Sequence, residues 1–157
     1  MPMRKELAIS PSERGSASDK RERLIDVVFH EAFHQYIFYV ADEYAAAVWF
    51  NEGNACYFQG IDFISGEKAK IEPTSRCAKM KEIAVSGKIK VEDFIQMKHV
   101  DFYAKRDTSY PFSWGLMFFL HKGAPVMKDK NKYSEIPGKY FSALLELRDG
   151  DKATAKA

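Results

Sequence analysis

The sequence predicts a single, mostly helical domain of the α+β class. Its 157 residues have the length of one domain and can enclose a hydrophobic core. With 46% hydrophobic and 29% charged residues, the composition is that of a folded globular chain and excludes a disordered or membranous one. Apolar residues recur at helical spacing in most segments, whereas only one segment after residue 41 carries a clear strand signal. Strands are therefore expected to be few.

The folded domain is expected to cover residues 19–148. Residues 1–18 are polar and rich in Ser, Arg and Lys, which indicates a flexible leader with a single short strand candidate at Leu7-Ala8-Ile9. Residues 149–157 are charged and rich in Ala, which predicts a tail outside the folded domain. No internal repeat or inter-domain linker interrupts the segment between them, so one domain is expected.

The first half of the domain predicts two helices followed by a hairpin. A strongly helix-forming run predicts the first helix over about 19–41. After a turn at 42–46, a second helix is expected over about 47–59, because Gly60 is a good helix-stop residue. Residues 61–71, with Ser65-Gly66 at their centre, predict a short β-hairpin.

The second half predicts further helices separated by polar segments. Helices are expected over about 75–85 and 91–97, and residues 98–109 are expected to form a polar loop. Pro111 is then placed in the first turn of a helix, where proline is tolerated, and residues 112–122 are apolar enough to form a core helix. A last amphipathic helix is expected over about 138–147.

A metal-binding pattern lies in the first expected helix, at His30-Glu31-Ala32-Phe33-His34. Residues four apart lie one above the other on a helix, so His30 and His34 can present ring nitrogens to one ion, with Glu31 beside them. Glu52 on the next helix is the candidate third ligand. Three protein ligands leave the fourth tetrahedral position to water, as in catalytic zinc sites. The alternative is a buried helix with two hydrogen-bonded core histidines, and Glu52 with its flanking residues favours the zinc site.

These residues resemble the gluzincins, zinc peptidases in which the third ligand is a Glu on the next helix. The more specific resemblance is to peptidase-MA-like bacterial domains of otherwise unassigned function, with patterns close to H-E-A-x-H-Q, W-x-x-E-G-x-A-x-Y-F and Y-x-x-S-W-x-L-x-x-F-L. Here the three patterns are His30-Glu31-Ala32-Phe33-His34-Gln35, Trp49-Phe50-Asn51-Glu52-Gly53-Asn54-Ala55-Cys56-Tyr57-Phe58 and Tyr110-Pro111-Phe112-Ser113-Trp114-Gly115-Leu116-Met117-Phe118-Phe119-Leu120. The likeness runs from about Leu24 to Leu147 and implies a zincin-like catalytic domain.

The chain also departs from this pattern. Thermolysin-like gluzincins carry an Asp four residues after the Glu ligand, where this chain has Cys56. Only about ten to twenty residues precede the metal-binding helix, where zincins normally carry several strands that form one wall of the cleft. The expected fold is therefore a truncated or minimal zincin, reduced at its N-terminal sheet.

The function implied by the resemblance is a zinc-dependent peptidase. Bound zinc acidifies water, and Glu31 is placed to act as the general base that takes its proton. The resemblance places Tyr110 near the site as the donor to the developing oxyanion. The alternative for Tyr110 is an aromatic residue at a helix start with its hydroxyl in solvent.

The expected partner is a peptide or protein substrate. The net charge of +2 predicts no strong attraction to nucleic acid or to a membrane surface, and no apolar run is long enough to span a membrane. Two other functions stay open: a non-catalytic zinc-binding module, and a chain whose cleft is completed by a missing N-terminal segment, a partner chain or an oligomer. The two cysteines do not fix the redox compartment, and the localisation is left open.

Overall fold

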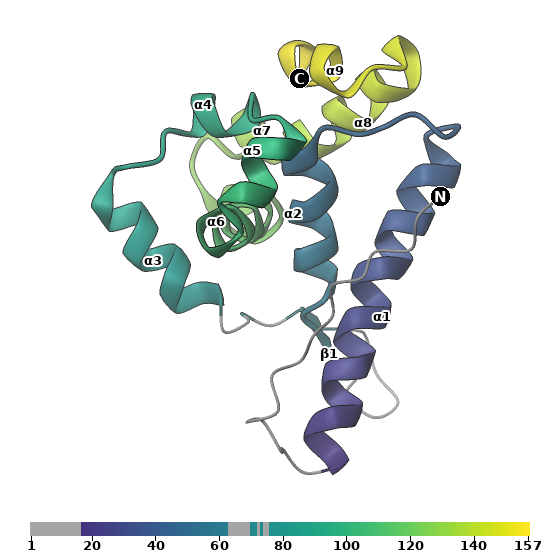
Figure 1. The fold of residues 1–157 in the computed structure, drawn as a ribbon. Coiled ribbons are helices and arrows are strands. Elements are labelled where there is room, and N and C mark those ends of the chain that lie inside the picture. The colour runs from purple at the N-terminus through teal and green to yellow at the C-terminus, as the bar shows by residue number, and fades with distance from the viewer. Residues whose placement is uncertain (1–16, 63–69, 72, 74–75) are drawn as a thin grey trace.

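The computed structural model describes residues 17–62, 70–71, 73 and 76–157, and within these the chain is mostly helical (Figure 1). The described strands are β1 (Ile61–Asp62) and β2 (Lys70–Ile71), which pair antiparallel with Ile61 opposite Ile71. The helical prediction is thus confirmed, and the β part of the α+β prediction is reduced to this pair. The two ends of the predicted hairpin do pair. Its centre, Ser65-Gly66, and residues 1–16 of the predicted leader lie outside the described residues.

Helices α1 (Ala17–Val40) and α2 (Val48–Phe58) lie side by side, close to the predicted ranges (Figure 1). The chain reverses between them through Asp42 and Glu43, whose φ angles of 53° and 65° fall in the left-handed region. Nearly every residue of α2 is buried, because its sequence is apolar on most sides and other helices surround it. The second helix is therefore the centre of the core.

Four helices follow the strands: α3 (Arg76–Ser86), α4 (Val91–Ile95), α5 (His99–Ala104) and α6 (Arg106–Phe118). Helix α6 packs against both α2 and α3. Its contact with α2 is close at Gly53, where an added Cβ would lie 2.8 Å from Met117 Cγ and 3.0 Å from the Ser113 carbonyl oxygen.

The predicted polar loop over 98–109 is wrong, because this segment forms α5 and the start of α6. Its charged side chains are exposed, while Phe102 is fully buried and fixes α5 to the core against Phe94 and Tyr110. The position predicted for Pro111 is also wrong, since it lies inside α6 and not in its first turn. Proline there removes the single N–H that would bond back to the Asp107 carbonyl, and the helix continues.

The C-terminal part of the chain is also helical. A π-helical turn (Phe119–Gly123) and a 3-10 turn (Ala124–Val126) lead to α7 (Lys130–Tyr133) and α8 (Ile136–Leu147). Helix α8 agrees with the predicted amphipathic helix. The segment predicted as a charged tail instead forms α9 (Gly150–Lys156), which packs against α8 and buries Ala153 completely.

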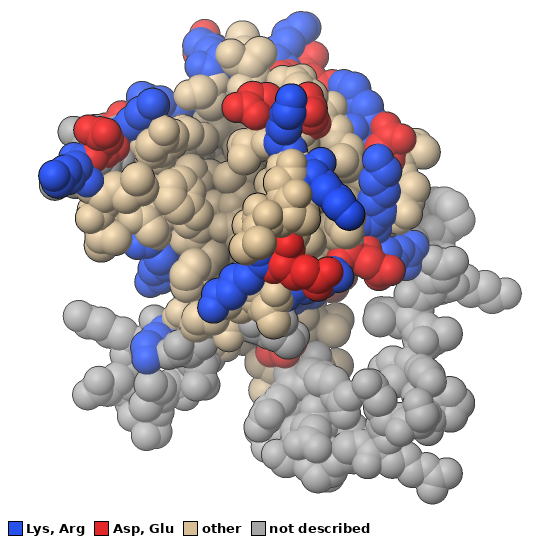
Figure 2. All heavy atoms as spheres, turned by 90° about the vertical axis from the view of Figure 1, so that its left-hand side faces the viewer, with Lys and Arg blue, Asp and Glu red and all other residues tan. Residues whose placement is uncertain are grey.

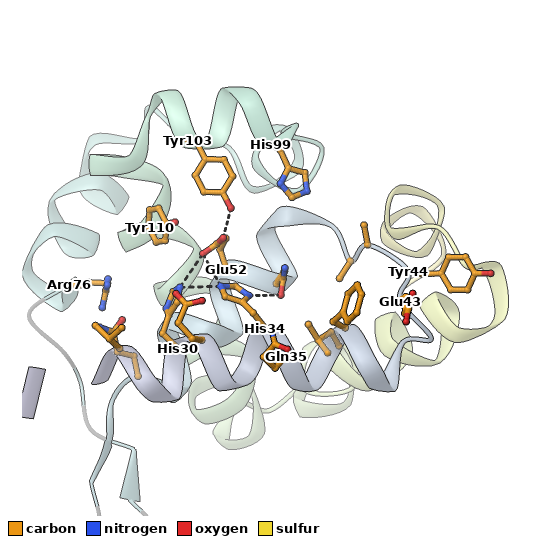
Figure 3. Close-up of a pocket in the computed structure, with 18 residues that line it drawn as sticks. His30, His34, Gln35, Glu43, Tyr44, Glu52, Arg76, His99, Tyr103 and Tyr110 are labelled. Carbon is orange, nitrogen blue, oxygen red and sulfur yellow. Dashed lines mark hydrogen bonds and ion pairs between the residues drawn. The ribbon is translucent and has the colours of Figure 1, made fainter. Parts of the chain in front are cut away.

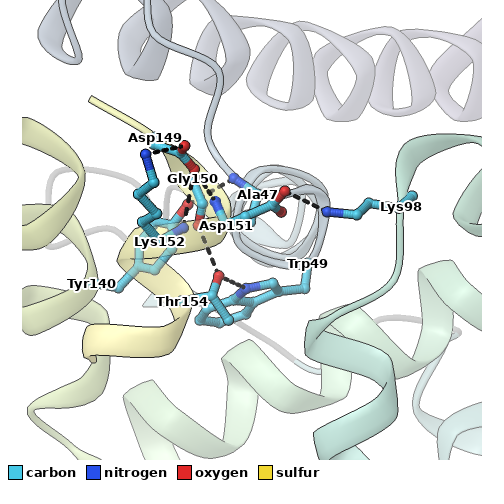
Figure 4. Close-up of polar contacts among 9 residues, drawn as sticks. All are labelled: Ala47, Trp49, Lys98, Tyr140, Asp149, Gly150, Asp151, Lys152 and Thr154. Atoms are coloured by element: carbon cyan, nitrogen blue, oxygen red, sulfur yellow. Dashed lines mark hydrogen bonds and ion pairs between the residues drawn. The ribbon is translucent and has the colours of Figure 1, made fainter. Parts of the chain in front are cut away.

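Helices α8 and α9 are hydrogen-bonded to the start of α2 (Figure 4). The Tyr140 hydroxyl of α8 accepts a 2.7 Å hydrogen bond from the Ala47 backbone N–H. The Trp49 indole N–H donates to Thr154 Oγ1 at 2.9 Å. The Asp149 carboxylate caps α9 by accepting from the backbone N–H groups of its first turn. The C-terminal helices therefore hold the entry to α2.

We expect Gly150→Ala to destabilise the fold by about 1–3 kcal/mol, because the added methyl group would overpack this junction. Its Cβ would lie 2.4 Å from the Ala47 backbone nitrogen and 2.7 Å from the Ala45 carbonyl oxygen. Gly138→Ala in α8 is the matched control, since its Cβ would meet nothing within 4 Å. Urea unfolding should show the control equal to the wild type or slightly more stable. Equal stability of the Gly150 variant would contradict the tight contact.

The described surface carries mixed charges and one uncovered apolar helix face. On the face in Figure 2, Lys and Arg alternate with Asp and Glu, so neither sign dominates. The exposed side of α1 carries Leu24, Val28, Tyr36 and Tyr39 at helical spacing. None of the described helices combines the length and the apolar content that crossing a bilayer requires.

Candidate metal centre

The three predicted ligands meet at the contact between α1 and α2 (Figure 3). His30 and His34 lie one turn apart on α1, with their Nε2 atoms 3.1 Å from each other. Glu52 Oε2 lies 3.4 Å from His30 Nε2 and 3.6 Å from His34 Nε2. In a tetrahedral site with zinc bonds of roughly 2.0–2.1 Å, neighbouring ligand atoms are about 3.3–3.4 Å apart. The group could therefore hold a metal ion of this size.

The surroundings of Glu52 favour a positive charge between the three side chains. Burial alone would raise the pKa of Glu52, but the two histidine rings and the Tyr103 hydroxyl hold it well below its ordinary range. Glu52 Oε2 is buried, and among the described residues the two histidine Nε2 atoms face it at 3.4 and 3.6 Å without completing a well-formed hydrogen bond. A buried, ionised oxygen without such a bond is costly unless a cation satisfies it. This is the structural observation that fits a metal ion.

Asn51 fixes the orientation of the His34 ring by a hydrogen bond. The Asn51 Oδ1 atom lies 2.9 Å from His34 Nδ1, and an amide oxygen can only accept, so Nδ1 carries the proton. In the neutral ring, the lone pair of Nε2 then faces Glu52 and His30, as a metal ligand requires. Burial lowers the pKa of His34, but its contacts with Glu52 and Asn51 outweigh burial and raise it above the ordinary value, so a metal ion competes with a proton at Nε2.

In the described part of the chain, no side chain orients the His30 ring as Asn51 orients that of His34. The Nδ1 atom of His30 is buried without a hydrogen-bond partner there. Cys56, which stands where thermolysin-like gluzincins have an Asp, is completely buried. Burial raises the pKa of its thiol to about 12, so the side chain is neutral. Cys56 therefore cannot supply the negative charge that a carboxylate would bring to this position.

Two tyrosines border the group from α5 and α6. The Tyr103 hydroxyl donates to Glu52 Oε1 at 2.5 Å. The Tyr110 ring lies 6.4 Å from the His30 ring, and burial together with the Glu52 charge raises the pKa of its hydroxyl. Tyr110 thus lies partly buried at the site, within α6 and not before its first residue.

Sequence reasoning missed two members of the site, Asn51 and Tyr103. Asn51 was visible as the polar neighbour of Glu52 on a helix that is otherwise mostly apolar. Tyr103 carried no comparable signal, because it lies in a segment expected to be a loop and is far from Glu52 in the sequence.

A cavity of about 960 Å³ opens over the metal group. Glu31, the predicted general base, lines it beside the two histidines. Arg76 lies on one side of the group and Tyr44 on the other, so the cavity extends past the metal group in both directions (Figure 3). Its volume is within the range of small-molecule ligand sites.

Comparison of the chain with protein-family models, with curated proteins and with solved structures found no match. The fold and the site together define a small, mostly helical domain with a His-His-Glu group that could hold a metal ion.

Proposed function

We propose that the chain is a zinc-dependent peptidase of the gluzincin type. The observation that carries the proposal is the convergence of His30 Nε2, His34 Nε2 and Glu52 Oε2 at 3.1–3.6 Å from one another, beside a cavity that Glu31 also lines. Two nitrogens and one carboxylate oxygen are a donor set that zinc uses in catalytic sites. The resemblance to gluzincins in sequence supports the same activity.

The three ligands, Glu31 and Tyr110 each have a task in the proposed hydrolysis. Zinc held by the three ligands would supply the positive charge that acidifies water and polarises an amide carbonyl. Glu31 would accept the proton of the attacking water and deliver it to the leaving amine. The Tyr110 hydroxyl would donate to the oxygen that gains negative charge as the carbonyl carbon becomes tetrahedral.

Metal removal tests the proposal directly. The zinc-loaded protein should cleave members of a diverse peptide mixture, detected by mass spectrometry as paired fragments. Treatment with a chelator should abolish the cleavage, and added zinc should restore it, because the ligand group lies on the folded scaffold of α1 and α2. A metal-loaded, folded protein that yields no fragments from any peptide would contradict peptidase activity.

A second candidate function is a non-catalytic zinc-binding module. It is favoured by the absence of any strand along the cavity in the described part of the chain, since β1 and β2 do not line it. Extended substrates usually bind by pairing with an edge strand. A cleft completed by a partner chain or oligomer is a separate alternative, favoured by the exposed apolar residues of α1. Metal uptake without cleavage by the isolated chain would support the non-catalytic module, whereas the assembly state in solution tests the completed cleft.

A further inference from the structure

The two oxygens of the Glu52 carboxylate have different surroundings. Oε1 accepts the 2.5 Å hydrogen bond from Tyr103, whereas Oε2 faces the Nε2 atoms of both histidines. Glu52 is buried, so little solvent reaches its carboxylate. The Tyr103 bond is charge-assisted and therefore stronger than a hydrogen bond between neutral groups.

Tyr103 is itself held in place by the core. Its neighbour Phe102 is completely buried and contacts Phe94 and Tyr110. The Tyr103 ring lies 6.1 Å from the His99 ring and 6.4 Å from the Tyr110 ring. The hydroxyl thus comes from a short helix that is fixed to the core on one side and reaches over Glu52 on the other (Figure 3).

We propose that Tyr103 is a positioning residue: its hydroxyl holds Glu52 Oε1 in a hydrogen bond, so that only Oε2 is free to bind a metal ion. The proposal rests on the metal site of the proposed function and not on its peptidase activity. A carboxylate that is free to turn can bind a metal through both oxygens, and the second oxygen would then fill the position that a catalytic site leaves to water. Tyr103 keeps that position open.

The unmodified protein gives the first test, with Co²⁺ as the probe in place of zinc. Four-coordinate Co²⁺ absorbs visible light more strongly than five- or six-coordinate Co²⁺. Two histidines, one carboxylate oxygen and one water should give the strong four-coordinate spectrum. A weak spectrum of higher coordination in the wild-type protein overturns the proposal, and so does a complete failure to bind metal.

Tyr103→Phe gives the second test, because it removes the hydroxyl and keeps the ring. The Co²⁺ absorption should weaken, and the dissociation constant for zinc, measured by competition with a chelator, should rise roughly 10–100-fold. Tyr36→Phe is the matched control, since Tyr36 is exposed on the same helix as the two histidines. It should match the wild type in both measurements. An unchanged Co²⁺ spectrum in Tyr103→Phe overturns the proposal.

A double-mutant cycle with Glu52→Ala separates positioning from a general structural role. If Tyr103 acts through Glu52, its removal should change the zinc dissociation constant little once Glu52 is already Ala. An effect of the same size in both backgrounds overturns the proposal. Metal binding is the readout throughout, so a protein that binds zinc but cleaves nothing would fail the proposed peptidase function and still decide the role of Tyr103.

Discussion

Glu31→Gln is expected to lower peptide hydrolysis by roughly a hundredfold or more while the zinc content stays at about one ion per chain. Glutamine has the shape of glutamate but cannot take a proton from water. The three atoms of the metal group belong to His30, His34 and Glu52, so the substitution removes no ligand. Metal analysis and a cleavage assay on the same preparation give both quantities.

Glu43→Gln is the matched control for this experiment. Glu43 lines the same cavity but does not belong to the metal group, so its loss of charge should cost far less activity. Loss of zinc together with activity in the Glu31 variant would show that Glu31 is a ligand and not the base. Full activity in that variant would remove Glu31 from the chemistry.

His34→Ala is expected to remove zinc from the protein, and hydrolysis with it. Outer partners of metal ligands typically contribute 10–100-fold to affinity, and a ligand itself should contribute more. His34 supplies one of the three donor atoms and is the one that Asn51 orients. Its side chain is partly exposed, so truncation to Ala should leave a folded protein, which circular dichroism can verify.

His99→Ala is the control, because His99 lines the same cavity outside the metal group. It should keep about one zinc per chain. If the His34 variant kept the same zinc content as this control, the ligand assignment would be wrong. A wild-type protein that takes up no zinc on addition would contradict the site as a whole.

The local part of the site could be predicted from sequence because helix geometry alone sets it. Residues four apart on a helix must lie one above the other, so the sequence around His30 and His34 fixes their common face as soon as α1 forms. Helix geometry alone could not predict that Glu52 lies beside the two histidines, because this depends on how α2 packs against α1. The sequence pointed to it through its resemblance to gluzincins and not through spacing alone.

The C-terminal end shows why composition misleads in a short segment. Residues 149–157 are charged and Ala-rich, which is typical of a solvated tail. The structure makes them a helix because Asp149 caps its first turn and Gly150 approaches the chain before α2. Only the cap is local. The close approach of Gly150 to Ala47 depends on tertiary packing and leaves no signal in the sequence of the segment.

By itself the sequence determined a mostly helical domain and the pairing of His30 with His34, because both follow from periodicities of a few residues. Only the tertiary structure decided which side chains surround Glu52. Tyr103 reaches it from α5, a helix that forms because Phe102 is buried in the core of other helices. Contacts between residues so far apart in the chain depend on the packing of several elements at once, and no local pattern encodes them.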